Sequence, residues 1–161
     1  MTSTRYPSAR TVLTDPFHFV AFGFGSGLMP YAPGTAGTFA GIPIFVVMQG
    51  LPTSVYVGTA CAMLLVGMWI CGRASNTLGV HDHSGIVWDE IVGFLFAMLA
   101  CPPGWRWIAA GAVLFRVFDI IKPWPVSLVD RRVGGGVGIM LDDLVAGAYC
   151  WVAMYGLAML I

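Results

Sequence analysis

Charged side chains are scarce in this sequence. Of its 161 residues, only 10% are Asp, Glu, Lys or Arg and 58% are apolar, and the mean hydropathy is +0.82. A soluble domain of average composition carries about 25% charged residues, so we predict an integral membrane protein. The basic and acidic residues cancel, and no polybasic run is present. We therefore expect neither nucleic acid nor a strongly acidic protein as a partner.

Cysteine pairs are also lacking, and the N-terminus does not have the pattern of a signal peptide. Arg5 and Arg10 lead into a Gly-rich stretch rather than a compact apolar core, so we expect no signal peptide. No C-x-x-C pair occurs, and we predict that the cysteines are reduced, buried core residues rather than metal ligands or disulfides. They are Cys61, Cys71, Cys101 and Cys150.

Apolar runs predict about five membrane-embedded helices, since crossing a hydrocarbon core takes roughly 20 helical residues. The tight turn "LPT" joins the first two runs into a helical hairpin. Residues 17–28 are too broken by glycine for a span and predict an interfacial helix or a re-entrant segment. We expect an all-α membrane bundle, one domain over residues 1–161, with residues 1–14 as a flexible cytoplasmic tail. The five runs cover residues 37–50, 54–72, 86–100, 107–121 and 144–161.

Basic residues in short loops predict the orientation in the membrane. If the N-terminus is cytoplasmic, only Arg106 falls on the outer side. The segments that carry most acids then flank the cytoplasmic loops, so we expect them to meet at the cytoplasmic face. That face also receives Arg5, Arg10, Arg73, Lys122, Arg131 and Arg132.

Seven of the eight acidic residues lie between Asp82 and Asp143, and four of them form adjacent pairs. "IVWDEIVG" contains Asp89 and Glu90, and "IMLDDLVAG" contains Asp142 and Asp143. Acids near a membrane are costly unless they are paired, hydrated or bound to a cation. Capping of a helix N-terminus is the alternative explanation. Capping does not explain adjacent acids, which point about 100° apart on a helix.

The two pairs share an aliphatic context with a glycine close behind, which suggests two helix starts that present carboxylates to one cation. Carboxylates that close need a divalent cation to neutralise them. Oxygen ligands suit Mg²⁺, Mn²⁺ or Ca²⁺ rather than Zn²⁺. The predicted metal ligands are Asp89, Glu90, Asp119, Asp142 and Asp143, with Asp82 nearby.

The "HDH" segment leaves alternatives open. His81 and His83 have the spacing to bind a transition metal, and one of them has the chemistry of a general acid toward a leaving alkoxide. Hydrogen bonding to nearby backbone, with no catalytic role, is equally compatible with the sequence.

A glycine-rich stretch, "GFGSGLMPYAPGTAGTFAG", has two explanations. Its backbone N–H groups form an anion nest, to which Ser26, Thr35 and Thr38 add hydroxyl donors. Alternatively, Gly37 and Gly41 form a small-residue step that packs a helix. It is not a P-loop, because no Gly-Lys-Ser/Thr follows.

"RVFDIIKPWP" places Arg116 and Asp119 on one helix face, with Lys122 one turn beyond. These cations bind phosphate or, alternatively, form an ion pair and a snorkelling lysine. Phosphate binding and membrane anchoring explain Arg131 and Arg132 equally well.

Together these features describe a site for a phosphorylated lipid headgroup. "GFGSGLMPYAPGTAGTFAGIP", "GVHDHSGIVWDEIVG", "FRVFDIIKPWP" and "GGVGIMLDDLVAGAY" resemble phosphatidylglycerophosphatase A, a family of bacterial lipid phosphatases, from about Asp15 to Tyr149. The resemblance implies hydrolysis of phosphatidylglycerophosphate to phosphatidylglycerol and phosphate, on the pathway to cardiolipin. It also implies Mg²⁺ as cofactor and a multi-pass protein of the bacterial inner membrane.

Within that resemblance, roles are assigned from the chemistry of the side chains. The catalytic candidates are Asp82, Asp89, Asp143, His81 and His83. The phosphate-binding candidates are Ser26, Gly34, Thr35, Thr38, Arg116 and Lys122.

Three rival functions make different demands on the sequence. A small ion or proton transport subunit would distribute its acids along the membrane depth, whereas these acids cluster on one side. A CDP-alcohol phosphotransferase would carry a longer Asp-Gly-Ala-Arg-Gly-Asp-Asp pattern, which is absent. A structural scaffold gives no reason for paired carboxylates.

Overall fold

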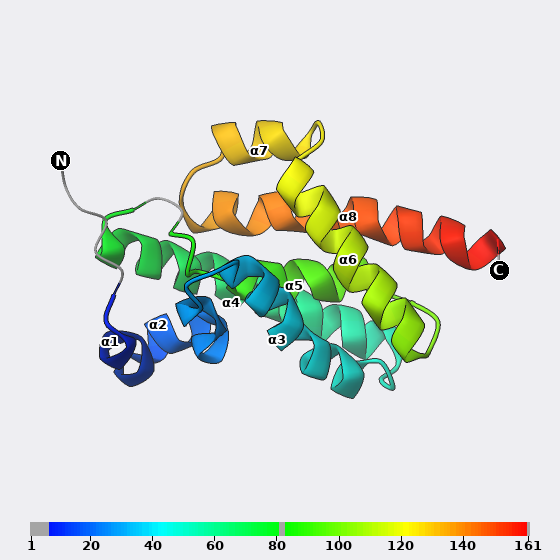
Figure 1. The fold of residues 1–161 in the computed structure, drawn as a ribbon, viewed down its shortest axis with the longest axis horizontal. Helices are drawn as coiled ribbons and strands as arrows, with labels where there is room; N and C mark the ends of the chain where they lie inside the picture. The colour runs from blue at the N-terminus through cyan, green and yellow to red at the C-terminus, as the bar shows by residue number, and fades with distance from the viewer. Residues whose placement is uncertain (1–6, 81–82, 161) are drawn as a thin grey trace.

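The computed structural model describes residues 7–80 and 83–160, and within these ranges it contains helices and no strand (Figure 1). The all-α prediction is confirmed for this part of the chain. The elements are α1 (Ala9–Thr14), α2 (Pro16–Ala21), the 3₁₀ helix η1 (Gly23–Leu28), α3 (Pro33–Met48), α4 (Thr53–Leu78), α5 (Trp88–Ala97), α6 (Trp105–Ile121), α7 (Val126–Arg132) and α8 (Gly135–Leu160).

Proline and glycine set several helix ends. Pro33 lies in the first turn of α3 and Pro52 directly precedes α4, where the fixed φ of proline suits a helix start. Gly79 ends α4 with a left-handed φ of 69°, which costs glycine little. Helix α3 ends at Met48 and α4 begins at Thr53, so the short turn predicted between the first two apolar runs is present.

Helix α5 is the centre of the fold. Eight of its ten residues are buried, and α3, α4, α6 and α8 all pack on it. Figure 1 shows α5 beside the long helices α4 and α8. The predicted hairpin partners α3 and α4 follow one another closely in the chain, but α3 packs chiefly on α5 and η1.

Two glycines allow that packing. A Cβ added to Gly37 would lie 2.7 Å from Val87 Cβ, and one added to Gly41 would lie 3.1 Å from Phe94 Cδ1. Both distances are too short for an ordinary contact. The helix-packing explanation of the Gly37–Gly41 step is therefore confirmed.

Two of the helices, α4 and α8, are long and apolar enough to cross a membrane, with 26 residues each. Helix α3 is a shorter apolar helix of 16 residues. At ten residues, α5 extends only about 15 Å, half of a hydrocarbon core of about 30 Å. The expected five spans are thus reduced to two candidates in the described residues, and the placement of the other helices in the membrane stays a prediction.

Residues 17–28 form α2 and η1, short helices and not a span, as the sequence predicted, and their placement at the membrane interface stays a prediction. Other smaller expectations differ from the structure. Residues 9–14, within the expected tail, form α1, and Val12 is fully buried. The four cysteines are free as predicted, but Cys61 is exposed, so the prediction that all are buried is wrong. Helix α7 lies between the fourth and fifth apolar runs, where no helix was predicted.

Candidate active site

One cavity, of about 320 Å³, gathers most of the acidic residues that the sequence singled out. Its walls come from the start of α3, the start of α5 and the segment before it, the end of α6, and the first half of α8. The lining residues are Pro33, Gly34, Ser84, Ile86, Asp89, Glu90, Arg116, Asp119, Ile120, Lys122, Asp142 and Asp143.

Three carboxylates form the centre of this cavity. Asp89, Glu90 and Asp143 each offer an oxygen atom, and these atoms all lie within 4.8 Å of one another. Only 8% of Asp89 and 2% of Asp143 is exposed. Asp89 Oδ1, Glu90 Oε2 and Asp143 Oδ2 are buried without a hydrogen-bond partner. We call these residues the three-acid cluster.

A glycine contact between α5 and α8 brings the two acidic pairs together. A Cβ added to Gly147 would lie 2.6 Å from the carbonyl oxygen of Gly93, and one added to Gly93 would lie 2.9 Å from that of Asp143. The two backbones therefore touch one helical turn beyond the acids. Asp89 and Glu90 lie in the first turn of α5, as predicted. Asp142 and Asp143 do not lie at a helix start, because α8 begins at Gly135.

Two basic side chains are bound to acids at the edge of the cavity. Arg116 Nη1 lies 2.7 Å from Asp119 Oδ2 and 3.8 Å from Glu90 Oε1. Lys122 Nζ donates a hydrogen bond of 2.7 Å to Asp142 Oδ2. The Arg116–Asp119 pair was an alternative in the sequence analysis and is present. The Lys122–Asp142 pair was not foreseen.

The charges of the cavity favour a cation. Five carboxylates line it and only two basic residues do, so three negative charges are left uncompensated when all these groups are ionised. The three-acid cluster offers one oxygen from each residue within 4.8 Å of the others, and one oxygen of each carboxylate is buried without a hydrogen-bond partner. This donor set fits Mg²⁺ or a similar divalent cation and contains no sulfur or imidazole ligand.

Gly34 lies against both the acids and Arg116. A Cβ at this position would overlap Glu90 Oε1 and lie 2.9 Å from Arg116 Nη2. The role proposed for Gly34 from the sequence was phosphate binding. The structure adds that only glycine leaves the Glu90 carboxylate and the Arg116 guanidinium where they are.

We expect Gly34→Ala to lower kcat/KM by about 100-fold, because displacement of a site group by about 1 Å costs that much. The fold should survive, since flexible side chains absorb the clash. Turnover and thermal unfolding of the purified variant check this. Gly58→Ala on α4 is the matched control: its added Cβ meets nothing within 4 Å, so activity should be unchanged. Full activity in Gly34→Ala would contradict the close fit.

The remaining predicted site residues lie elsewhere or outside the described residues. His81 and Asp82 fall outside the described residues. His83 is buried, its Nδ1 accepts a hydrogen bond of 3.0 Å from the Gly85 N–H, and it is not among the residues that line the cavity. Ser26 donates to the Gly23 carbonyl at 2.8 Å and does not line the cavity either.

Two threonines predicted to bind phosphate lie beside the cavity rather than in it. Thr35 and Thr38 line a neighbouring groove, and Thr38 Oγ1 donates to the Gly34 carbonyl at 3.1 Å. Sequence reasoning missed four cavity residues: Pro33, Ser84, Ile86 and Ile120. For Ser84 and Ile86, the position between "HDH" and "WDE" was an available signal.

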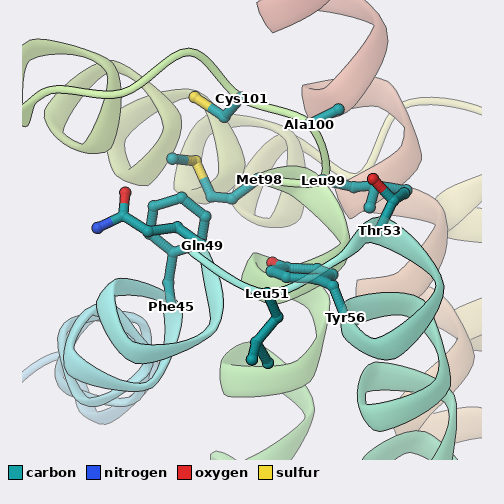
Figure 2. Close-up of a pocket in the computed structure, with 9 residues that line it drawn as sticks. All are labelled: Phe45, Gln49, Leu51, Thr53, Tyr56, Met98, Leu99, Ala100 and Cys101. Carbon is teal, nitrogen blue, oxygen red and sulfur yellow. The ribbon is translucent and has the colours of Figure 1, made fainter.

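A second cavity lies at the other end of the same helices and offers no comparable chemistry. Figure 2 shows side chains from the end of α3, the start of α4 and the segment after α5 converging there. None of its nine lining residues is charged, and the Tyr56 hydroxyl donates to the Leu95 carbonyl at 2.6 Å. The acid-lined cavity is therefore the candidate active site.

The sequence is similar to known proteins over most of its length. The family model described as PgpA, Phosphatidylglycerophosphatase A, matches residues 19–158. The phosphatidylglycerophosphatase A of Escherichia coli strain K12 is 45% identical over 140 residues, which cover 86% of this chain and 81% of the relative. That of Haemophilus influenzae is 39% identical over 153 residues, 94% of each chain.

A third relative has a different name. A Bacteroides thetaiotaomicron protein, 37% identical over 83% of this chain and 87% of its own length, is named, provisionally, a phosphatidylinositol-3-phosphatase. No solved structure matches this chain.

Proposed function

The chain belongs to the phosphatidylglycerophosphatase A family of lipid phosphatases, and from this membership we propose that it hydrolyses phosphatidylglycerophosphate to phosphatidylglycerol and phosphate with Mg²⁺. The observation that carries the proposal is the three-acid cluster, whose oxygens lie within 4.8 Å of one another in the cavity. Such a cluster binds the cation that phosphoryl transfer needs.

Asp89, Glu90 and Asp143 would hold the cation, and Asp119 and Asp142 surround them. When bound, Mg²⁺ polarises phosphoryl oxygens and offsets the repulsion between the carboxylates and a phosphate. The chain's own cations contribute as well. Arg116 and Lys122 stand at the edge of the cavity, where their N–H groups would donate to phosphate oxygens.

Proton transfers complete the hydrolysis. A bond forms between the oxygen of water and phosphorus, and the bond from phosphorus to the glycerol oxygen breaks. Asp119 or Asp142, outside the three-acid cluster, would accept the proton of the attacking water. The glycerol oxygen gains a proton as it leaves, a role predicted from the sequence for His81 or His83, of which His83 does not line the cavity.

The transport alternative is less well supported. A proton or ion path needs acids spread through the membrane depth. Here Asp89, Glu90, Asp119, Asp142 and Asp143 share one cavity. A compact cluster of acids suits a reaction at one membrane depth, whereas conduction of an ion needs acids at several depths.

The membrane placement belongs to the same proposal. We infer a multi-pass protein of the bacterial inner membrane with the cavity at the cytoplasmic face. Lys122 directly follows α6 at the end that lines the cavity, whereas Arg106 lies in the first turn of α6, at the other end. Arg73 lies next to Gly72 of α4, which approaches Gly136 near the start of α8. The positive-inside rule then places the cavity on the cytoplasmic side.

Phosphate release from lipids by the detergent-purified protein tests the function. We expect release from phosphatidylglycerophosphate in Mg²⁺, with kcat/KM at least about tenfold above that for phosphatidic acid or phosphatidylinositol 3-phosphate. No release from any lipid would contradict the phosphatase proposal. Faster release from phosphatidylinositol 3-phosphate would reject phosphatidylglycerophosphate as the preferred substrate but support hydrolysis of a lipid phosphate.

A further inference from the structure

A second opening lies between α3 and α6, directly beside the acid-lined cavity. It has a volume of about 280 Å³ and an almost wholly apolar surface. We call it the α3–α6 groove. Its lining residues are Thr35, Thr38, Phe39, Ala112, Val113, Arg116, Val117 and Ile120.

The groove adjoins the active-site cavity. Arg116 and Ile120 line both openings, and Gly34 of the cavity is followed in the chain by Thr35 of the groove. A molecule whose charged end is in the cavity would therefore extend its other end along the groove.

The walls of the groove specify the chemistry of that other end. Phe39, Val113 and Ile120 are 61%, 63% and 70% exposed. Thr38 uses its hydroxyl within α3, where it donates to the Gly34 carbonyl. The walls thus provide few hydrogen-bonding groups for a polar ligand and a large apolar surface for an apolar ligand. From Ala112 to Ile120 the groove follows α6 for about 12 Å, which suits an extended chain.

We propose that the α3–α6 groove binds an acyl chain of the lipid whose phosphate occupies the acid-lined cavity. The inference rests on the proposed phosphatase function and adds the residues that select a membrane lipid. The headgroup lies near the end of α6, at Asp119 and Lys122, and the chain runs back along Val117 and Val113. Because the groove walls are exposed apolar side chains, the chain enters sideways from the hydrocarbon core.

Narrowing the groove tests the proposal by kinetics. We expect Val113→Trp and Val117→Trp each to raise KM for long-chain phosphatidylglycerophosphate about tenfold, with kcat within about twofold, because the cavity is untouched. Val152→Trp on α8 is the matched control: Val152 is 62% exposed, close to the 63% of Val113, and lines neither opening. Equal KM values in all three variants would overturn the groove assignment.

Photocrosslinking separates failure of the groove from failure of the function. The probe is phosphatidylglycerophosphate with a diazirine in one acyl chain, and phosphatidylcholine with the same chain is the control. We expect labelling at Phe39 and Val113, competed by unlabelled phosphatidylglycerophosphate and absent with the control lipid. Equal labelling by both lipids would overturn the proposal. Specific labelling without phosphate release would keep the groove and reject the proposed hydrolysis.

Discussion

Replacing Asp143 by Asn is expected to lower kcat/KM for phosphate release on the order of 10³-fold, the scale on which loss of a strong electrostatic contact slows a buried site. Asp143 is 2% exposed and shares the cluster with Asp89 and Glu90. The amide keeps the shape of the side chain but not its charge. Asp89→Asn should behave alike, since both carboxylates serve one ion.

Stability separates loss of chemistry from loss of folding. In the absence of metal, neither variant should unfold at a lower temperature than the wild type, because removing one of three crowded negative charges relieves repulsion. Asp15→Asn is the matched control. Asp15 caps α2 through the N–H groups of Phe17 and His18, and Asn caps equally well, so its activity should stay within about twofold. Near-normal turnover in Asp143→Asn would remove Asp143 from the site.

Removal of divalent metal is expected to lower the rate of phosphate release by about 10³-fold or more. Three oxygens of the cluster are buried without a hydrogen-bond partner, and Arg116, 3.8 Å from Glu90 Oε1, offsets only part of the negative charge of the three carboxylates. The measurement is turnover in excess EDTA, followed by addition of Mg²⁺, Mn²⁺ or Zn²⁺. Mg²⁺ and Mn²⁺ should restore activity, because the donors are oxygen atoms.

A binding readout makes the metal prediction independent of turnover. Mg²⁺ should raise the unfolding temperature of the wild type, since a ligand that binds only the native state stabilises it. The same addition should have no effect on Asp143→Asn. Turnover that persists in EDTA, together with an unchanged unfolding temperature, would refute a metal at this cluster.

The sequence predicted the composition of the site better than its geometry. Five acids, Arg116, Lys122 and Gly34 were singled out and line one cavity. Their convergence was predictable because each lies near an end of an apolar run that the predicted topology places on the cytoplasmic side. The Arg116–Asp119 pair was predictable from helical spacing alone. The Lys122–Asp142 pair was not, because it joins residues 20 positions apart through the packing of α6 and α8.

The start of α8 shows why a local rule failed. The glycine run before Asp142 was expected to be loop, since glycine disfavours helices. In the structure, Gly136 packs against α4, where an added Cβ would lie 2.6 Å from the Gly72 N atom. Close packing with a second helix therefore overrides intrinsic propensity, and α8 begins at Gly135 instead of beside the acids.

The prediction of five spans is not confirmed by the lengths of the helices, for a related reason. The apolar run at residues 86–100 has the composition of a lipid-facing helix, but α5 is short and eight of its ten residues are buried. Apolar composition alone does not separate a helix surrounded by protein from one surrounded by lipid. Only the contacts of α5 with four other helices make that distinction.

The contact of Gly93 with Gly147 also limits how this sequence can change over time. Most core positions in a helical bundle accept another apolar residue when a neighbour adjusts its volume. At this crossing Gly147 faces the main chain, namely the carbonyl of Gly93. No substitution makes a main-chain carbonyl smaller, so no neighbour can compensate for a larger residue at position 147. The positions that hold the acids together are thus fixed more strictly than much of the apolar interior, although they carry no functional group of their own.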